Sequence, residues 1–220
     1  MTTLFRLDAS IRSQGSVTRA VADTLQTALQ DDQSHLDVVR RDVGLEPVDP
    51  RAWAEATFSA HVPVDRRSPT QTTALASATR LADEVTAADV LLFAVPLYNW
   101  GVSQHFKAWF DLVATDPRLT PISQTPAIAG RPAFLVTARG GGAGPGSPRE
   151  GWDHASGWMR RVLEDVWRLD LQVIETELTL AEQVPAMAGL RDQAGRLLET
   201  AHLTAWTAGR SISARTRSVA

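Results

Sequence analysis

One almost continuous apolar run, DVLLFAV at Asp89–Val95, constrains the fold more than any other stretch of the sequence. Its length suits a strand, and the lack of alternating polar residues predicts a strand that is covered on both faces, as in a parallel sheet. Similar but less uniform runs predict further strands at Thr3–Leu7, Leu36–Val43, Pro132–Ala138 and Leu171–Leu178. Parallel strands of one sheet are joined by right-handed crossovers, so helices should lie between them.

Segments with helical spacing of apolar residues do separate these runs. Helices are expected from about Ser16 to Leu29, near Trp53, and at Thr72–Ala87, Val102–Ala114, Trp152–Trp167 and Pro185–Ala208. The alternation predicts an α/β fold: a doubly wound five-stranded parallel sheet of order 2-1-3-4-5, with helices on both faces. We expect one domain over residues 1–208. The remaining residues, GRSISARTRSVA at 209–220, contain little to bury and predict a loose tail.

Composition excludes several classes of function. The formal net charge of -3 predicts no basic face for nucleic acid. The absence of cysteine excludes disulfides, thiolate metal sites and a cysteine nucleophile, and the histidines lack metal-ligand spacing. The N-terminus lacks the features of a signal peptide, and no apolar stretch approaches the length of a membrane span. We therefore expect a cytoplasmic protein without a metal site.

Ligands of doubly wound sheets bind beyond the C-terminal ends of the strands, where the strand order reverses. The loops after the first, third and fourth predicted strands should surround that point. These loops, Asp8–Ala20, Pro96–Trp100 and Thr137–Gly146, are also the most unusual stretches of the sequence. The sequence thus predicts a single ligand site formed by three loops at one edge of the sheet.

The first of these loops has the chemistry of a phosphate site. Ser10, Ser16 and Thr18 supply hydroxyl groups, and the next helix begins near Ser16. Exposed N–H groups and the helix dipole favour an anion at such an N-terminus. A dinucleotide fingerprint and a Walker-type lysine are both absent, which argues against a nucleoside triphosphate. A plain N-cap role for Ser16 is the alternative.

The other two loops suit a flat ring. Backbone groups and side chains of Leu97–Trp100 can face and cover a planar ligand, and Asn99 offers both a donor and an acceptor. In the third loop, the glycines at 140–142 let the backbone approach a ligand closely. The alternatives are aromatic packing on the core for the second loop and a flexible surface loop for the third.

Taken together, these residues resemble the FMN-dependent NADH:quinone oxidoreductases, also called azoreductases, which have a flavodoxin-like fold. The family reads Pro-Met-Tyr-Asn-Phe where this chain has Pro96-Leu97-Tyr98-Asn99-Trp100. Phe106-Lys107 and Phe110-Asp111 match a Leu-Lys and a Phe-Asp that follow. Arg139-Gly140-Gly141 matches the family's Ser-Arg-Gly-Gly loop from the second position on. The similarity extends over roughly Leu4–Glu177.

The resemblance implies FMN as the cofactor, NADH or NADPH as the electron donor, and a quinone or azo compound as the acceptor in a ping-pong cycle. It also implies a homodimer. By resemblance, the cofactor-binding residues are Ser10, Ser16, Val17, Thr18, Pro96, Leu97, Tyr98, Asn99, Trp100, Ala138, Arg139, Gly140 and Gly141. No catalytic side chain is assigned, because the flavin carries the chemistry. Asn99 and Arg139 are candidates for tuning the flavin, and an outward-pointing Arg139 is the alternative.

The chain departs from the family pattern at positions that affect the acceptor. Ala138 replaces the first serine of the Gly-rich loop. The segment at residues 115–130 is shorter than the family's, and Leu119 falls where the family has a tyrosine that covers the flavin. Trp152 and Trp158 are candidate replacements for that aromatic wall, although core packing suits Trp158 and Trp167 better. Two other functions stay open: a specialised biosynthetic flavin reductase with a nitro, azo or enone acceptor, and a flavodoxin-like electron carrier that is not an enzyme.

Overall fold

The computed structural model describes residues 2–32, 35–59, 61–122 and 125–219. Its central sheet has five parallel strands in the order β2-β1-β3-β6-β7, which confirms the predicted topology. The strands are β1 (Thr2–Asp8), β2 (Leu36–Asp42), β3 (Val90–Ala94), β6 (Pro132–Ala138) and β7 (Asp170–Thr176). The apolar run that predicted the most buried strand is β3, and every residue of this strand is buried.

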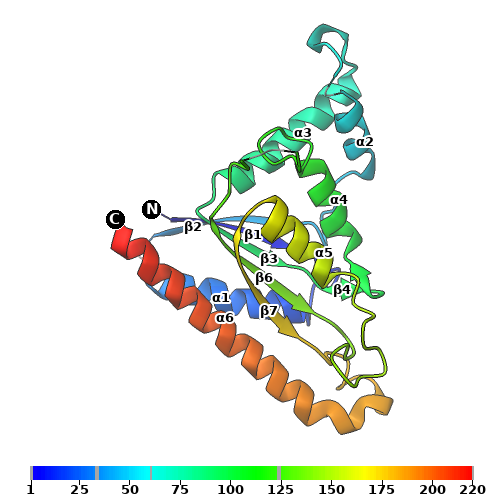
Figure 1. The fold of residues 1–220 in the computed structure, drawn as a ribbon, viewed down its shortest axis with the longest axis vertical. Helices are drawn as coiled ribbons and strands as arrows, with labels where there is room; N and C mark the ends of the chain where they lie inside the picture. The colour runs from blue at the N-terminus through cyan, green and yellow to red at the C-terminus, as the bar shows by residue number, and fades with distance from the viewer. Residues whose placement is uncertain (1, 33–34, 60, 123–124, 220) are drawn as a thin grey trace.

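Helices cover both faces of the sheet (Figure 1). One face carries α1 (Val17–Asp32) and α6 (Arg191–Val219). The other carries α2 (Pro50–Ser59), α3 (Pro69–Thr86), α4 (Gln104–Val113) and α5 (Ser156–Arg160). A π-helical segment, η2 (Arg161–Val166), continues α5, and short 3-10 turns, η1 (Val64–Arg66) and η3 (Pro185–Leu190), precede α3 and α6. No helix in the described ranges is long and apolar enough to cross a membrane.

The core on the α3–α4–α5 side is aromatic. Phe93 of β3 lies against Trp109 of α4 and Trp167, with ring centroids 6.1 and 6.5 Å away. The indole N–H of Trp167 donates to the carbonyl oxygen of Leu119 at 2.9 Å. Leu119 is itself fully buried in this cluster. The segment that contains Leu119 is therefore anchored in the core.

The C-terminal residues differ from the prediction of a loose tail. Helix α6 continues to Val219, and Ile212 is only 4% exposed. A Cβ atom at Gly209 would lie 2.7 Å from the carbonyl oxygen of Leu25 and 2.8 Å from Cβ of Ala28 in α1. The small residue lets the two helices approach closely. The prediction of a loose tail rested on the scarcity of apolar residues after position 208, whereas Gly209 serves helix packing.

A short hairpin was not predicted. Strands β4 (Leu97–Tyr98) and β5 (Gly101–Val102) pair antiparallel between β3 and α4. The residues that connect them, Asn99 and Trp100, have positive φ angles of 49° and 62°. Two-residue hairpin loops favour this left-handed geometry, which asparagine tolerates but tryptophan rarely adopts. Backbone strain of this kind clusters at functional sites.

Candidate cofactor-binding site

A cavity of about 390 Å³ lies at the C-terminal ends of β1, β3 and β6. Its size is within the range of small-molecule sites. Every residue predicted as cofactor-binding from the sequence lines it. They are Ser10, Ser16, Val17, Thr18, Pro96, Leu97, Tyr98, Asn99, Trp100, Ala138, Arg139, Gly140 and Gly141. The structure thus brings the three loops together at one edge of the sheet, and Thr179 and Leu180, which follow β7, complete the wall.

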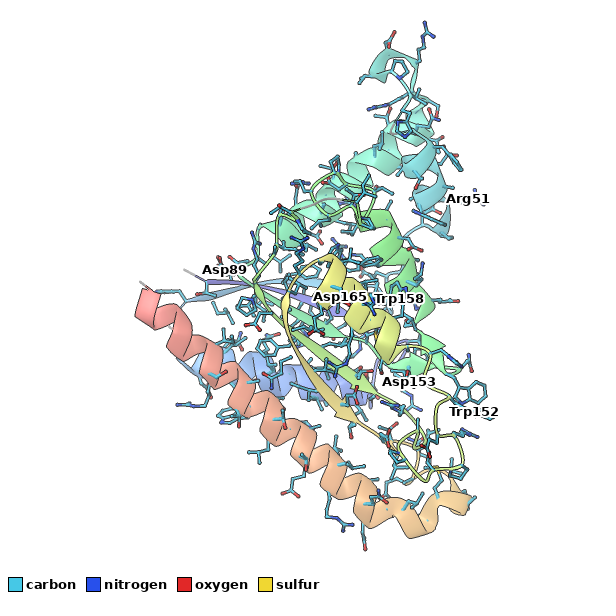
Figure 2. The ribbon with its side chains drawn as sticks, in the orientation of Figure 1. Arg51, Asp89, Trp152, Asp153, Trp158 and Asp165 are labelled. Carbon is cyan, nitrogen blue, oxygen red and sulfur yellow. The ribbon has the colours of Figure 1, made fainter. Side chains whose placement is uncertain are left out.

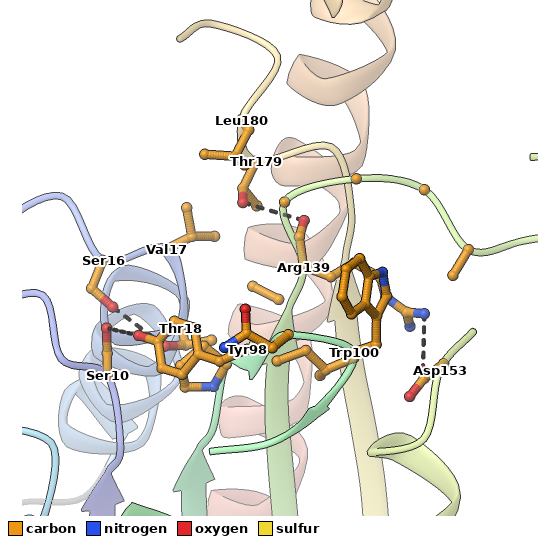
Figure 3. Close-up of a pocket in the computed structure, with 18 of the residues that line it drawn as sticks. Ser10, Ser16, Val17, Thr18, Tyr98, Trp100, Arg139, Asp153, Thr179 and Leu180 are labelled. Atoms are coloured by element: carbon orange, nitrogen blue, oxygen red, sulfur yellow. Dashed lines mark hydrogen bonds and ion pairs between the residues drawn. The ribbon is translucent and has the colours of Figure 1, made fainter. Parts of the chain in front are cut away.

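One end of the cavity is lined by hydroxyl groups at the start of α1 (Figure 3). Ser10, Ser16 and Thr18 are all buried, at 2%, 8% and 1% exposure. The Ser16 hydroxyl accepts a hydrogen bond from the amide of Arg19 at 3.4 Å and lies 3.3 Å from the Thr18 hydroxyl. Ser16 is therefore an N-cap as well as a lining residue, so the two interpretations of Ser16 are compatible. The first amides of a helix have no intrahelical partner, which suits an anion here.

Arg19 anchors the backbone of the first loop, a role that the sequence did not indicate. Its guanidinium donates to the Ser10 carbonyl oxygen at 2.7 Å and to both carboxylate oxygens of Asp42. Burial alone would raise the pKa of Asp42, but hydrogen bonds from Arg19 and from the Leu45 amide outweigh it and hold that pKa below its usual value. The hydrogen bond to Asp42 in turn raises the pKa of Arg19, against the effect of burial. The ion pair fixes the backbone of the first loop.

Asp8, at the start of the first loop, binds arginine side chains. Its side chain is fully buried and binds Arg6 through both oxygens at 3.1 Å and Arg40 Nε at 2.7 Å. A buried carboxylate needs such partners because an unpaired one would be costly. With its charge compensated by arginines, Asp8 does not face the hydroxyl-lined end as a free negative group.

The second loop is joined to the first by Tyr98. Its phenolic oxygen accepts a hydrogen bond from the Ile11 amide at 3.1 Å and lies 3.4 Å from the Ser10 hydroxyl. The left-handed residues Asn99 and Trp100 then turn the chain back at the cavity. The alternative, simple packing on the core, does not describe Trp100, which is 46% exposed. The hairpin geometry therefore places this aromatic ring at the cavity rather than in the interior.

The Gly-rich loop is bonded to the segment that follows β7. The amides of Thr179 and Leu180 both donate at 3.2 Å to the carbonyl oxygens of Arg139 and Gly140, respectively. A Cβ atom at Gly140 would lie 2.5 Å from Cδ1 of Leu180, so a side chain here would displace that of Leu180. These bonds argue against the alternative of a loop without fixed partners.

Arg139 lines the cavity, but carboxylates hold its guanidinium. Ion pairs of 2.9, 3.4 and 3.4 Å join it to Asp153, Glu175 and Glu177, and its side chain is 13% exposed. Burial opposes ionisation of Asp153, yet hydrogen bonds from Ser156 and Ala155 and the charge of Arg139 hold its pKa below the usual range. The guanidinium therefore ties the Gly-rich loop to the start of α5.

Aromatic side chains form the other end of the cavity. The rings of Trp100 and Trp152 meet edge to face with centroids 5.6 Å apart, and the guanidinium carbon of Arg149 lies 5.5 Å from the Trp100 centroid. Trp152 lies at the periphery of the molecule, whereas Trp158 lies on α5 (Figure 2). Trp158 packs against Phe110 and Trp167 is buried, as predicted for both. Trp152 takes the predicted place in the aromatic wall.

The residues present fit FMN. Its phosphate requires donors at one end, which the buried hydroxyl groups and the first amides of α1 supply. Its flat ring requires an apolar slot of backbone and aromatic groups, which the hairpin and the Gly-rich loop supply at the other end. The described residues contain no cluster of three or more His, Asp or Glu side chains that could hold a metal ion.

The sequence model of one protein family, described as a flavodoxin-like fold, matches residues 1–198. The chain therefore belongs to this family. Among its relatives, a Streptomyces avermitilis protein named FMN-dependent NADH:quinone oxidoreductase is 35% identical over 191 residues, covering 86% of this chain and 87% of that protein. A Streptomyces coelicolor protein of the same name is 32% identical over 216 residues, covering 98% and 97% of the two chains.

Solved structures show the same fold. A Bacillus anthracis azoreductase superposes with a TM-score of 0.76 at 17% identity, over 96% of this chain and all of that one. A second structure from that species, described as an FMN-dependent NADH-azoreductase in complex with FMN, gives a TM-score of 0.75 at 11% identity, over 97% and 100% of the chains. At these identities the likeness establishes the fold alone.

Proposed function

We propose that this protein is an FMN-dependent oxidoreductase that passes hydride from NADH, or NADPH, through bound FMN to quinones or azo compounds by a ping-pong mechanism. The main support for this proposal is the cavity together with the similarity to a relative. A cavity with a hydroxyl-lined helix N-terminus at one end and an aromatic slot at the other lies in a chain that is 35% identical to a protein named for this activity.

In this proposal, residues 1–208 and the rest of α6 form one FMN-binding domain. One end of the cavity binds the phosphate and the other binds the ring. Ser10, Ser16, Val17 and Thr18 hold the phosphate with hydroxyl and amide donors, assisted by the dipole of α1. Pro96–Trp100 and Ala138–Gly141 would hold the ring on its two sides. Bound FMN would supply the hydride-transfer chemistry, so the protein needs no catalytic side chain of its own.

The chain's own residues position the ring and tune its potential. Gly140 and Gly141 line the slot, and their amides would stabilise negative charge on the edge of a bound ring without reorganisation. Arg139 contributes indirectly, by fixing the glycines through its bonds to carboxylates. In the second loop, the polar side chain of Asn99 also lines the cavity and would hydrogen-bond to the ring.

We also propose that the protein works as a homodimer. Trp53 and Phe58 of α2 and Val64 of η1 are 48%, 76% and 77% exposed. They lie on the segment that projects furthest from the sheet in Figure 1. Apolar side chains gathered on one projection are typical of an interface. A second copy would cover them, and because NADH is an intracellular donor, we place the reaction in the cytoplasm.

Spectroscopy and turnover on the purified protein test this function. We expect a bound flavin spectrum that bleaches on anaerobic addition of NADH or NADPH and returns on addition of a quinone. Steady-state oxidation of NADH with a small quinone should follow parallel-line kinetics. A protein that binds FMN but turns over no quinone or azo compound would be an electron carrier instead. A protein that neither contains nor takes up FMN would contradict the proposal.

A further inference from the structure

Arg149 is a cation at the aromatic end of the cavity that no carboxylate neutralises among the residues the structure describes. Its guanidinium carbon lies 5.5 Å from the centroid of Trp100. A Cβ atom placed on Gly141 would lie 3.7 Å from Arg149 Nη1, so the guanidinium lies between the hairpin and the Gly-rich loop. Both neighbours line the cavity, as Arg149 itself does.

Arg149 and Arg139 both line the cavity, but they differ in their partners. Asp153, Glu175 and Glu177 surround Arg139, so its charge is more than compensated. Arg149 instead rests on an aromatic ring, which restrains a guanidinium while leaving its in-plane N–H groups free to donate. The cavity therefore offers an anion one uncompensated forked donor at its aromatic end.

The adjacent rings indicate what kind of anion fits. Trp100 and Trp152 are 46% and 49% exposed and meet at an interplanar angle of 70°. Their exposed faces can stack on a flat aromatic molecule, which would remove apolar surface from water. The phosphate-binding hydroxyls lie at the opposite end of the cavity (Figure 3). A group bound by Arg149 is thus separate from the cofactor phosphate.

We propose that Arg149, with Trp100 and Trp152, is a specificity site for acceptors that carry an anionic group, a sulfonate or carboxylate, on a flat aromatic system. This inference rests on the proposed reductase function and names its acceptor class. In the reaction, NADH and one proton reduce the quinone to the hydroquinone and yield NAD⁺. The sulfonate or carboxylate is unchanged and serves only for binding.

Two probes that differ in charge test the proposal: 1,4-naphthoquinone and 1,4-naphthoquinone-2-sulfonate. The R149Q variant should lower kcat/KM for the sulfonate about tenfold, the effect of one partly exposed charge-assisted contact, and leave the neutral quinone within about twofold. R149K retains the charge but lacks the forked pair of donors. Its kcat/KM for the sulfonate should therefore lie between the values of wild type and R149Q. R161Q is the matched control, since Arg161 pairs with Asp165 on η2, away from the cavity.

Calorimetry on the FMN-loaded protein supplies a readout that does not require turnover. The sulfonate should bind wild type about tenfold more tightly than R149Q, with a difference that shrinks as salt rises. Equal losses for both quinones, or no loss for either, would overturn the proposal. A rise in KM for NADH alone would assign Arg149 to the donor and overturn it as well. If no quinone is reduced, the proposed function fails, and the binding difference still decides the role of Arg149.

Discussion

The phenolic oxygen of Tyr98 lies 3.1 Å from the amide nitrogen of Ile11, although the two residues are 87 positions apart. Tyr98 is the only tyrosine of the chain, and its hydroxyl is the direct hydrogen-bonded link between the β1 loop and the β4–β5 hairpin in the described part of the molecule. The hydroxyl-lined end of the cavity and its ring end are thereby held in one geometry. This relationship implies that changes in one loop affect ligand binding at the other.

Replacing Tyr98 by phenylalanine should weaken FMN binding without removing the aromatic ring. The Ile11 amide loses its acceptor, and one such hydrogen bond is worth about 1 kcal/mol, or about fivefold in the dissociation constant. Fluorescence titration of the apoprotein measures the effect. Because the lost bond acts on the first loop, binding of riboflavin, which lacks the phosphate, should change less. An unchanged FMN affinity in Y98F would show that the two loops are positioned independently.

Asp42 should make the first loop sensitive to acid. Its depressed pKa in the folded state means that its stabilising contribution is present above the unfolded value of about 3.9 and is lost as the pH falls through the folded pKa. The D42N variant should be less stable than wild type at pH 7, and this difference should shrink towards pH 3. Urea unfolding at a series of pH values measures it. A constant difference across that range would contradict the assignment.

Substitutions at two glycines of α6 should have opposite signs. G209A adds a methyl group that would lie 2.7 Å from the Leu25 carbonyl oxygen, so we expect a loss of about 1–3 kcal/mol from overpacking. G195A adds a methyl group with no atom within 4 Å and should gain about 0.5–1 kcal/mol from helix propensity. Denaturant unfolding of both variants and of wild type measures these changes in stability. Stabilisation by both substitutions would mean that the end of α6 does not pack on α1.

Arg139 should act on stability and loop position rather than on the flavin directly. R139Q leaves three carboxylates close together without their cation, and we expect a loss of about 2–4 kcal/mol in unfolding free energy. Adding D153N should recover part of this loss, because it removes one of the repelling charges. The flavin reduction potential, measured on the same variants, separates the roles. A shifted potential with unchanged stability would favour direct contact between Arg139 and the flavin.

The sequence predicted the sheet order and the three loops that line the cavity, because both depend on local signals. Buried strands read as apolar runs, and loops that follow parallel strands meet at one edge of the sheet. The ion pair of Arg19 with Asp42 was not predictable in this way. It joins two residues that are 23 positions apart, and in the sequence each is indistinguishable from an ordinary charged surface residue.

The aromatic residues, too, were predicted only in part. A tryptophan was expected beside the cavity and two in the core, and the structure agrees for Trp152, Trp158 and Trp167. The positive φ angles at Asn99 and Trp100 were missed, because Asn-Trp lacks the glycine that usually marks a two-residue hairpin loop. The end of α6 was missed because its polar composition hid a packing contact through Gly209.

We propose that the loops after β1, β3 and β6 form one cofactor site with a phosphate end and a ring end. Titration of the apoprotein with FMN and with riboflavin tests it most directly, since the two ligands differ only in the phosphate. Two charge-assisted hydrogen bonds are worth about 3 kcal/mol, so FMN should bind at least about a hundredfold more tightly. Equal dissociation constants for the two flavins, or no binding of either, would contradict the account.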